Sequence, residues 1–394
     1  MERHRAEPDH EGGSRVGLNR VLVLSASAGA GHVRAAQALE RALVATGRVR
    51  EVRHVDILQY TSKLFRRVYA QAYLDLVNRA PEVLGWLYDY FDEPGRHERL
   101  RLALNKLNTT RFVRLLGRER PDWAVSTHFL PAEIIAWLRS KGRLATRQAI
   151  VVTDFDIQAI WLTHHVDRYF VALDETRVHL ERLGVPPAAI TVSGIPIDPV
   201  FAEPKDARAM RHKHGLEPDL TTILVSAGGF GVGPVEALVH TLLELRHPVQ
   251  LVVICGRSAE LKARLDELAA ARPPHVTPAL HVVGYTTEMD EHMAAADLLV
   301  GKPGGLTSSE ALARGLGLVI VHPIPGQEER NADHLLEAGA AIRCNNLPAL
   351  AWKIDRLLGD PARLTVMRAN ARRLARPHAA RDIAATLLGT HSDS

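Results

Sequence analysis

The chain of 394 residues is poor in cysteine, in aromatic side chains and in net charge. Its two cysteines, Cys255 and Cys344, are far apart and show no Cys/His ligand spacing, which argues against a disulfide scaffold or a structural zinc site. Basic and acidic residues number 49 and 45, and the net charge of +4 is too weak for a dedicated nucleic-acid-binding protein. No run approaches the ~18 apolar residues that a membrane-spanning helix needs. Residues 1–19 are polar and include acidic residues, so we expect a flexible tail there and no secretory signal.

Short apolar runs alternate with longer amphipathic segments along most of the chain, a pattern typical of doubly wound parallel α/β sheets. In the first half, the runs expected to form strands lie at residues 21–24, 124–126, 150–153 and 169–172. In the second half the pattern begins again, with strands expected at residues 222–225, 251–254, 298–300 and 318–321. Two βα domains are therefore predicted.

The predicted division of the chain follows from this second start. It comprises a tail (1–19), a first domain (20–200), a linker rich in proline and charge (201–220), a second domain (221–360), and C-terminal helices with a tail (361–394). The prolines of the linker discourage a long helix there. No strand is expected after residue 361, so we expect the last helices to pack across the domains.

One segment of the first domain, residues 60–118, breaks the alternation of strands and helices. Five of the seven tyrosines lie between residues 60 and 91, interleaved with basic side chains. Aromatic rings beside cationic side chains suit a helix that lies in a lipid headgroup layer. An ordinary helical insertion that packs on its own domain has the same composition, and the sequence leaves both interpretations open.

The first expected strand leads into a small-residue loop, AGAGH at residues 28–32, and then into a helix. Glycines let the backbone approach a ligand, and the free N–H groups at a helix start form a positive pole for an anion. That pole also favours the neutral imidazole of His32, which can accept a proton from a hydroxyl group. His32 is therefore a candidate general base, although any βα turn favours glycine.

The matching turn of the second domain, SAGGFGVG at residues 226–233, is also rich in glycine and suits a pyrophosphate. Its spacing departs from the G-x-G-x-x-G fingerprint of NAD-binding proteins, and no acidic residue closes the following strand at residues 254–255. In the first domain Asp56 does end the expected second strand, but the glycines before it do not complete the fingerprint. We therefore do not expect NAD binding.

Two further loops follow later strands of the second domain. In GKPGGLTSSE (301–310), the glycines expose backbone N–H groups, Thr307 or Ser308 is placed to cap the helix, and Glu310 suits the vicinal hydroxyls of a ribose. Lys302 is not a Walker lysine, because a proline follows it. In PIPGQEERN (323–331), Gln327 and Glu328 suit the hydroxyls of a hexose. All these loops are expected at the carboxyl ends of parallel strands, where open α/β sheets bind ligands.

Taken together, the loops resemble those of glycosyltransferase family 28, and specifically the processive diacylglycerol β-glucosyltransferases and monogalactosyldiacylglycerol synthases. The resemblance rests on GAGHVRAAQAL (29–39), VVTDFDIQAIWLTHHVDRYFVALDET (151–176), VSGIPIDPVF (192–201), VICGRSAELK (253–262) and residues 282–342, which include KPGGLTSSEA and PGQEERNA. It is closer to the bacterial glucosyl enzymes than to the plant-type galactosyl enzymes.

The resemblance implies a GT-B fold, in which two Rossmann-like domains face each other across a cleft and C-terminal helices pack across both. The second domain would bind a UDP-sugar, with Tyr285 and Thr286 near the uracil and Glu310 on the ribose. The glycine-rich loops would lie along the diphosphate, and Gln327 and Glu328 on the hexose. The implied donor-binding residues are Gly228, Gly229, Phe230, Gly231, Arg257, Tyr285, Thr286, Met289, Pro303, Gly304, Gly305, Leu306, Thr307, Glu310, Gln327, Glu328 and Asn331.

The resemblance also implies that His32 is a catalytic residue, which serves as the general base or lines the transfer site, and that transfer inverts the anomeric centre to give a β-glycoside. The implied acceptor-side residues are Gly31, His128, Asp154 and Trp161, of which His128 and Asp154 would orient His32 or compete with it as base. Residues 154–156 spell D-x-D, a metal-binding motif of another glycosyltransferase fold, but they follow a strand of the acceptor domain. We therefore expect no metal and no cofactor, the UDP-sugar being a co-substrate.

The partners implied are a UDP-hexose, diacylglycerol and an anionic membrane surface, with no nucleic acid and no obligate protein partner. The enzyme would lie on the cytoplasmic side, peripheral to the inner face of the cell membrane. Glucose is favoured over galactose, and the number of sugars added in succession stays open. The alternatives are a UDP-galactose-dependent monogalactosyldiacylglycerol synthase, a UDP-GlcNAc transferase to a polyprenyl-linked acceptor, a UDP-sugar 2-epimerase, and a regulatory protein that senses UDP-sugar without turnover.

Overall fold

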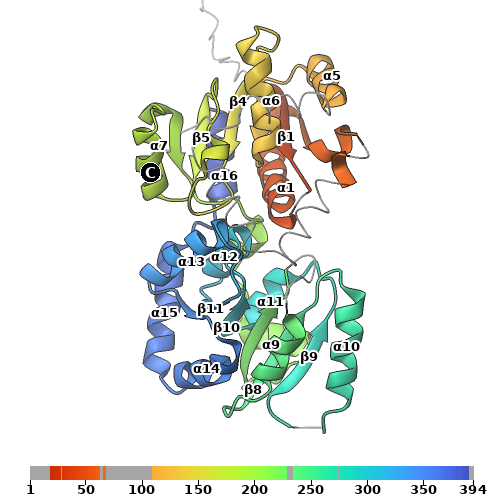
Figure 1. The fold of residues 1–394 in the computed structure, drawn as a ribbon, viewed down its shortest axis with the longest axis vertical. Helices are drawn as coiled ribbons and strands as arrows, with labels where there is room; N and C mark the ends of the chain where they lie inside the picture. The colour runs from red at the N-terminus through yellow and green to blue at the C-terminus, as the bar shows by residue number, and fades with distance from the viewer. Residues whose placement is uncertain are drawn as a thin grey trace, which may run out of the picture.

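The computed structural model describes residues 18–27, 29–62, 65–67, 109–228, 234–273 and 276–389. These residues form two α/β domains, one above the other in Figure 1. The predicted tail up to residue 17 and most of the predicted insertion, residues 68–108, lie outside the described residues. No helix within the described ranges is both long and apolar enough to cross a bilayer.

The first domain is built on a parallel sheet of six strands in the order β2-β1-β3-β4-β5-β6. Its strands are β1 (Leu18–Ser25), β2 (Val49–Asp56), β3 (Trp123–Ser126), β4 (Arg147–Val151), β5 (Arg168–Val171) and β6 (Ile190–Val192). Helices α1 (Ala30–Ala45), α5 (Thr110–Glu119), α6 (Phe129–Ser140) and α7 (Asp174–Arg182) belong to this domain. Successive residues of β1 enter different cores: Val21 and Val23 join the buried cluster that contains α1, whereas Leu22 and Leu24 join the cluster of α5 and α6.

The second domain repeats this plan with the strand order β12-β11-β10-β7-β8-β9. Its strands are β7 (Thr221–Ser226), β8 (Val249–Ile254), β9 (Ala279–Val283), β10 (Leu298–Gly301), β11 (Gly317–Val321) and β12 (Ala341–Cys344). Its helices are α9 (Val235–Leu242), α10 (Ala259–Ala270), α11 (Met289–Ala295), α12 (Gly305–Ala313), α13 (Gln327–Glu337) and α14 (Leu350–Leu358). The direction of winding reverses between β7 and β10, as it does between β1 and β3, and such switch points are where doubly wound sheets bind ligands.

The C-terminal helices connect the two domains a second time. Helix α15 (Pro361–Leu374) packs on α12, α14 and β11 of the second domain. Helix α16 (Ala379–Leu387) then crosses to the first domain, where Ile383 and Leu387 share a buried cluster with Leu39 and Leu43 of α1. In Figure 1 it lies, in blue, among the first-domain elements. The predicted α/β fold with helices packing across both domains is confirmed.

All eight strands expected from apolar runs are present, as is β2, the expected second strand that ends at Asp56, but β6, β9 and β12 were not predicted. Each of the three lies at the edge of its sheet. Their sequences mix polar with apolar residues, as at His281 and Arg343. The segment between the domains contains only one short α-helix, α8 (Ala207–Lys213), as its prolines suggest. Among the described residues of the predicted insertion, α5 lies at its C-terminal end.

Candidate active site

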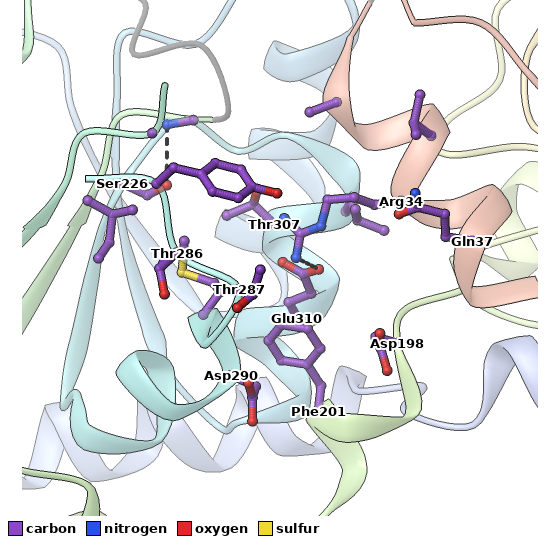
Figure 2. Close-up of a pocket in the computed structure, with 18 of the residues that line it drawn as sticks. Arg34, Gln37, Asp198, Phe201, Ser226, Thr286, Thr287, Asp290, Thr307 and Glu310 are labelled. Atoms are coloured by element: carbon purple, nitrogen blue, oxygen red, sulfur yellow. Dashed lines mark hydrogen bonds and ion pairs between the residues drawn. The ribbon is translucent and has the colours of Figure 1, made fainter. Parts of the chain in front are cut away.

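A cavity of about 380 Å³ separates the carboxyl ends of the two sheets. One wall is α1, whose Arg34 and Gln37 project into it, and the other is formed by the loops that follow β7, β8 and β9 together with α11 and α12. Figure 2 shows Arg34 reaching from α1 to Glu310 on α12. The cavity is therefore assembled from both domains, as a two-substrate site would require.

Both helices that point into this region begin without a side-chain cap. The residues before α1 and α12 are Gly29 and Gly304, and neither helix has a capping side chain at its N-terminus. The predicted cap at Thr307 or Ser308 is wrong, because α12 already begins at Gly305 and both side chains lie inside the helix. Uncapped first-turn N–H groups stay available to an anionic ligand.

His32 lies in the first turn of α1, between the cavity-lining residues Ala30 and Val33. Its Nδ1 atom is 2.9 Å from the carbonyl oxygen of Thr127 and 3.0 Å from Oγ1 of Thr153. A carbonyl oxygen only accepts hydrogen bonds, so Nδ1 carries the proton and Nε2 holds the lone pair. Burial lowers the pKa of His32, partly opposed by the negative charge of Asp154 and the bond to Thr127. The neutral ring can act as a base at Nε2.

Two further aromatic rings lie against His32 on the acceptor side. The His128 ring meets it edge-on with centroids 4.8 Å apart, and Trp161 lies 6.2 Å away. The backbone N–H of Leu130 donates to Nδ1 of His128, which caps α6, so the proton of neutral His128 is on Nε2. Burial holds the pKa of His128 well below its usual value. In this tautomer Nε2 of His128 carries a proton and cannot act as a base. Of these two histidines, His32 is the one with a lone pair at Nε2.

Asp154 and Asn331 link the two domains beside this site. Nδ2 of Asn331 on α13 donates to Asp154 Oδ1 at 2.9 Å, and the N–H of Phe155 donates to Asn331 Oδ1 at 2.8 Å. Burial raises the pKa of Asp154, while the bond from Asn331 and the charge of His32 oppose that rise. Both polar groups of the buried Asn331 side chain thus bind the first domain, although Asn331 was predicted to contact the donor.

The backbones of the two domains approach each other closely at the start of α12. A Cβ atom added to Gly305 would lie 2.1 Å from the carbonyl oxygen of Thr153 and 3.1 Å from Cα of Asp154. Only glycine fits there without a backbone shift. A Cβ on Gly31 would meet Leu306 Cβ at 3.9 Å, an ordinary contact. Leu306 belongs to the same buried cluster as Ala35 and Phe155 of the first domain.

Glu310 lies one turn inside α12 and is almost completely buried. Burial raises its pKa to about 7, and the neighbouring Asp290 acts in the same direction, while Arg34 opposes the rise. Arg34 Nη2 donates to Oε1 of Glu310 at 2.5 Å, and Oε2 has no hydrogen-bond partner. Glu310 lines the cavity, as predicted for a residue that contacts the donor.

The residues predicted near the uracil line the far end of the same cavity. The guanidinium of Arg257 lies over the ring of Tyr285 at 5.2 Å, and both residues are exposed. Thr286 and Met289 line the wall beside them. Figure 2 shows Thr286 on the side of the cavity opposite Gln37. An exposed aromatic ring in a cavity provides a face on which a base can stack.

The glycine-rich loops are described in part. Gly228 follows β7, lines the cavity and has φ of +72°, a conformation that favours glycine. The predicted residues Gly229, Phe230 and Gly231 lie outside the described residues. At the other loop, Leu306 and Thr307 line the cavity. Pro303 precedes Gly304, the residue before α12.

The residues predicted for the hexose lie beside the cavity, at the start of α13. Oε2 of Glu328 accepts the N–H of Ile324 at 2.7 Å, and a Cβ on Gly304 would lie 3.7 Å from its Oε1. Burial raises the pKa of Glu328 to about 7, whereas it lowers the pKa of the nearby Lys302. Gln327 is the first residue of α13. A half-buried carboxyl group on α13 and a half-buried amino group on the loop before α12 thus lie near the N-terminus of α12.

The D-x-D carboxylates do not converge on one point in the described structure. Asp154 binds Asn331, and Asp156 forms an ion pair with Arg330 at 2.9 Å. One cluster with metal-ligand geometry occurs among the described residues, formed by His214, Glu288 and Glu291. Its two carboxylates already bind Nζ of Lys213, and its residues do not line the cavity.

Three residues that shape the site were not predicted: Arg34, Thr127 and Thr153. Thr127 directly follows β3, and Thr153 lies two residues after β4. Polar residues just after buried strands are typical of ligand sites in open α/β sheets, and this pattern could have indicated both threonines. Arg34 projects from α1 on the same side as Gln37 and Arg41, at spacings of three and seven residues. The polar stripe on this helix can be read from the sequence. The pairing of Arg34 with Glu310 cannot, because the two residues belong to different domains.

Two family models match the chain in succession. The model described as monogalactosyldiacylglycerol (MGDG) synthase matches residues 32–197, and the model described as glycosyl transferases group 1 matches residues 210–374. The processive diacylglycerol β-glucosyltransferase of Bacillus pumilus (strain SAFR-032) is 30% identical over 368 residues, which cover 92% of this chain and 93% of that enzyme. The chain belongs to the processive diacylglycerol β-glucosyltransferase family.

Other relatives agree with this assignment. The processive diacylglycerol β-glucosyltransferase of Bacillus subtilis (strain 168) is 30% identical over 356 residues, covering 90% of this chain and 91% of that enzyme. The crystal structure of MurG from Acinetobacter baumannii superposes with a TM-score of 0.63 and 18% identity, covering 94% of this chain and 99% of that one. At this identity the likeness shows the GT-B fold alone. Membership of the family confirms the predicted resemblance and identifies the chain as a hexosyltransferase.

Proposed function

We propose that this enzyme transfers glucose from UDP-glucose to the free hydroxyl of diacylglycerol, with inversion, to form β-glucosyldiacylglycerol. The observation that carries the mechanism is the bond from His32 Nδ1 to the Thr127 carbonyl oxygen, which leaves Nε2 as a base beside the interdomain cavity. The family relatives named for this reaction support the choice of substrates.

The donor would occupy the cavity along the second domain. Its uracil would lie by Tyr285 and Thr286, and its ribose hydroxyls would bind Glu310. The diphosphate would follow Gly228 and the start of α12, where uncapped N–H groups point at it. The remaining proposed donor contacts are Arg257, Met289, Pro303, Gly304, Gly305, Leu306, Thr307 and, outside the described residues, Gly229, Phe230 and Gly231.

The transfer step is a single displacement at the anomeric carbon. The acceptor oxygen forms the new C–O bond while its proton passes to Nε2 of His32. The bond between the anomeric carbon and the phosphate oxygen breaks on the opposite face, and UDP leaves with the electron pair. Inversion of the α-linked donor sugar gives the β-glycoside. Stabilisation of the departing diphosphate by helix N-termini requires no metal.

The hexose would face the start of α13. Gln327 and Glu328 supply an amide and a carboxyl group for its hydroxyls, while Asn331 holds Asp154 in the other domain. Glu328 and Lys302 together provide an acceptor and a donor beside the N-terminus of α12. We propose that this loop selects glucose over galactose, because the two sugars differ only in the direction of one hydroxyl group.

The acceptor would approach from the first domain. The rings of His128 and Trp161 lie beside His32, and Phe129 packs against both of them. This aromatic cluster suits the glycerol and the first part of the acyl chains. Diacylglycerol resides in a bilayer, so we propose that the enzyme works peripherally on an anionic cytoplasmic membrane face, through the segment 60–118. We propose no nucleic-acid or obligate protein partner and no cofactor.

The test uses the purified full-length chain with vesicles that contain diacylglycerol and an anionic lipid, and either UDP-glucose or UDP-galactose. Lipid products are read by mass spectrometry, and the same reactions are run with His32→Ala. We expect hexosyldiacylglycerol from UDP-glucose with the wild-type enzyme only. Absence of glycolipid with both donors would contradict the proposal, and parallel reactions with a polyprenyl-linked acceptor, or with UDP-GlcNAc alone, would then test transfer to that lipid and epimerisation.

A further inference from the structure

The carboxylate proposed to hold the ribose is already engaged from the opposite domain. Arg34 Nη2 donates to Glu310 Oε1 at 2.5 Å, and Figure 2 shows this bond inside the cavity. The second oxygen, Oε2, is buried and has no hydrogen-bond partner. While Arg34 stays in this position, neither oxygen of Glu310 is therefore open to a ligand hydroxyl.

This arrangement leaves Glu310 incompletely satisfied. A buried carboxylate oxygen without a partner is unfavourable, and two vicinal hydroxyls of a ligand would satisfy both oxygens at once. Burial and the charge of Asp290 already disfavour the anion, as the raised pKa of about 7 reflects. Asp290 itself is paired with Lys205 and Arg314, so Arg34 is the cation that faces Glu310 across the cavity.

Arg34 is less buried than its partner. Its side chain is 38% exposed, against 2% for Glu310. Loss of the guanidinium alone would leave a buried carboxylate unpaired, whereas ligand hydroxyls bound to Glu310 would replace the hydrogen bond that Arg34 supplies. The Arg34 side chain can therefore leave Glu310 while α1 and α12 keep their positions.

An alternative anionic partner would lie within one helical turn. Thr307 precedes Glu310 by three residues, so the two side chains share a face of α12 and both line the cavity. One turn of helix is about 5.4 Å, a distance that rotation of an arginine side chain covers. At that point the guanidinium would reach the N-terminal end of α12, where the donor diphosphate is proposed to lie. Arginine binds phosphate oxygens in a fork, which suits it to such a contact.

We propose that Arg34 exchanges partners during the reaction: it covers Glu310 in the empty site, and it moves to the donor diphosphate when the ribose hydroxyls take its place on Glu310. This inference rests on the proposed function, since it assumes a uridine nucleotide in the cavity. It makes Arg34 a residue of the acceptor domain that contacts the leaving group. The cation would then arrive only when the nucleoside is in place, so leaving-group stabilisation is coupled to correct donor binding.

The test compares uridine, which lacks phosphate, with UDP. Binding of each is measured by calorimetry at pH 8.5, where the carboxyl of Glu310 is largely ionised, for the wild-type chain, Arg34→Gln and Arg41→Gln. Arg41 is the matched control, because it lies on the same helix and lines the same cavity but pairs with Asp198. Turnover of UDP-glucose with diacylglycerol vesicles is measured for the same three proteins.

In Arg34→Gln we expect uridine to bind about fivefold more tightly, because no guanidinium has to be displaced. The advantage of UDP over uridine should shrink by about tenfold, and kcat should fall, because the diphosphate loses a charged contact. Arg41→Gln should show neither change in binding. Weaker uridine binding in Arg34→Gln would mean that Arg34 stays on Glu310 when the nucleoside binds. An unchanged ratio of UDP affinity to uridine affinity would mean that Arg34 does not contact the diphosphate. Either result overturns the inference. Failure of the wild-type chain to bind uridine or UDP would instead contradict the proposed donor site itself.

Discussion

His32 Nδ1 lies 2.9 Å from the carbonyl oxygen of Thr127, and this contact decides which nitrogen of the ring is the base. The carbonyl oxygen requires a donor, so the proton is on Nδ1 and the lone pair on Nε2. Thr127 follows β3 and His32 lies in the first turn of the helix after β1, so the neighbouring strands at the sheet's switch point hold the two groups together. The orientation of the base is thus fixed by the sheet itself.

Replacement of His32 by Ala should abolish most transfer and spare donor binding. General-base catalysis contributes about 10²–10⁴-fold, so kcat should fall by that factor while the Kd for UDP changes little, because His32 does not line the cavity. Stopped assays with radiolabelled UDP-glucose and calorimetry with UDP measure the two quantities. The matched variant His128→Asn keeps an acceptor that caps α6 and should retain far more activity. Equal losses in the two variants would remove the special role of His32.

The pH dependence of transfer should report the low pKa of His32. The base acts only when neutral, so kcat should rise with pH through the folded-state pKa, with its midpoint below the usual histidine value of 6.5. The charge of Asp154 raises that pKa, so Asp154→Asn, which keeps an oxygen for Asn331 Nδ2, should move the acid limb to lower pH. A pH–rate profile of both proteins checks this. An acid limb that moves to higher pH in Asp154→Asn would contradict the assignment.

Gly305→Ala should impair catalysis by separating the domains. The new Cβ would lie 2.1 Å from the Thr153 carbonyl oxygen, so the backbone must shift at the point where Thr153 also contacts His32. A displacement of about 1 Å between reacting groups can cost ~10²-fold in rate, and we expect a loss of that order in kcat. Gly304→Ala places its Cβ 3.7 Å from Glu328 Oε1 and should cost much less. Steady-state kinetics measures both, and similar losses would show that the close approach at Gly305 is unimportant.

Glu328→Gln should stabilise the enzyme and inactivate it. The pKa of Glu328 is raised from 4.5 to about 7 in the fold, so the folded state holds this proton more tightly than the unfolded state does. Its contribution to stability is present below pH 4.5 and is lost as the pH rises towards 7. Glutamine resembles the protonated acid and keeps an oxygen for the Ile324 N–H. The free energy of unfolding should rise by roughly 1–2 kcal/mol at pH 8 and less at pH 5.5.

Urea unfolding at the two pH values measures this change, and transfer assays measure the loss of activity. A variant destabilised at pH 8 would show that the Glu328 anion is favourable in the fold. A variant that is stabilised and fully active would instead argue against a contact between Glu328 and the hexose.

The fold could be predicted from sequence because most strands are buried on both faces. Runs such as residues 251–254 are continuously apolar, and glycine-rich turns follow several of them. The edge strands β6, β9 and β12 carry polar residues and left no such pattern. The lack of a strand after residue 361 indicated that the last helices pack across the domains, but not that α16 would pack on α1.

The site could be predicted only where chemistry is local in the chain. His32 and the glycines of its turn lie within five residues, and Glu310 follows its own glycine loop. The bond from Arg34 to Glu310 spans 276 residues and depends on how two domains dock. The bonds of Asn331 also depend on this docking. Asn331 was predicted to contact the donor, and in the structure it binds Asp154 and Phe155 of the first domain. Contacts between domains leave no periodic pattern in a single sequence.

The most direct test of the central claim is a competition between donors on a single lipid surface. Diacylglycerol vesicles are incubated with the enzyme, ¹³C-labelled UDP-glucose and unlabelled UDP-galactose in equal amounts, and the glycolipid is analysed by mass spectrometry and by the anomeric coupling in its proton NMR spectrum. We predict a labelled product with a β-anomeric linkage, absent with His32→Ala. A product that carries mainly unlabelled hexose, or an α-linkage, would contradict glucose transfer by inversion at His32.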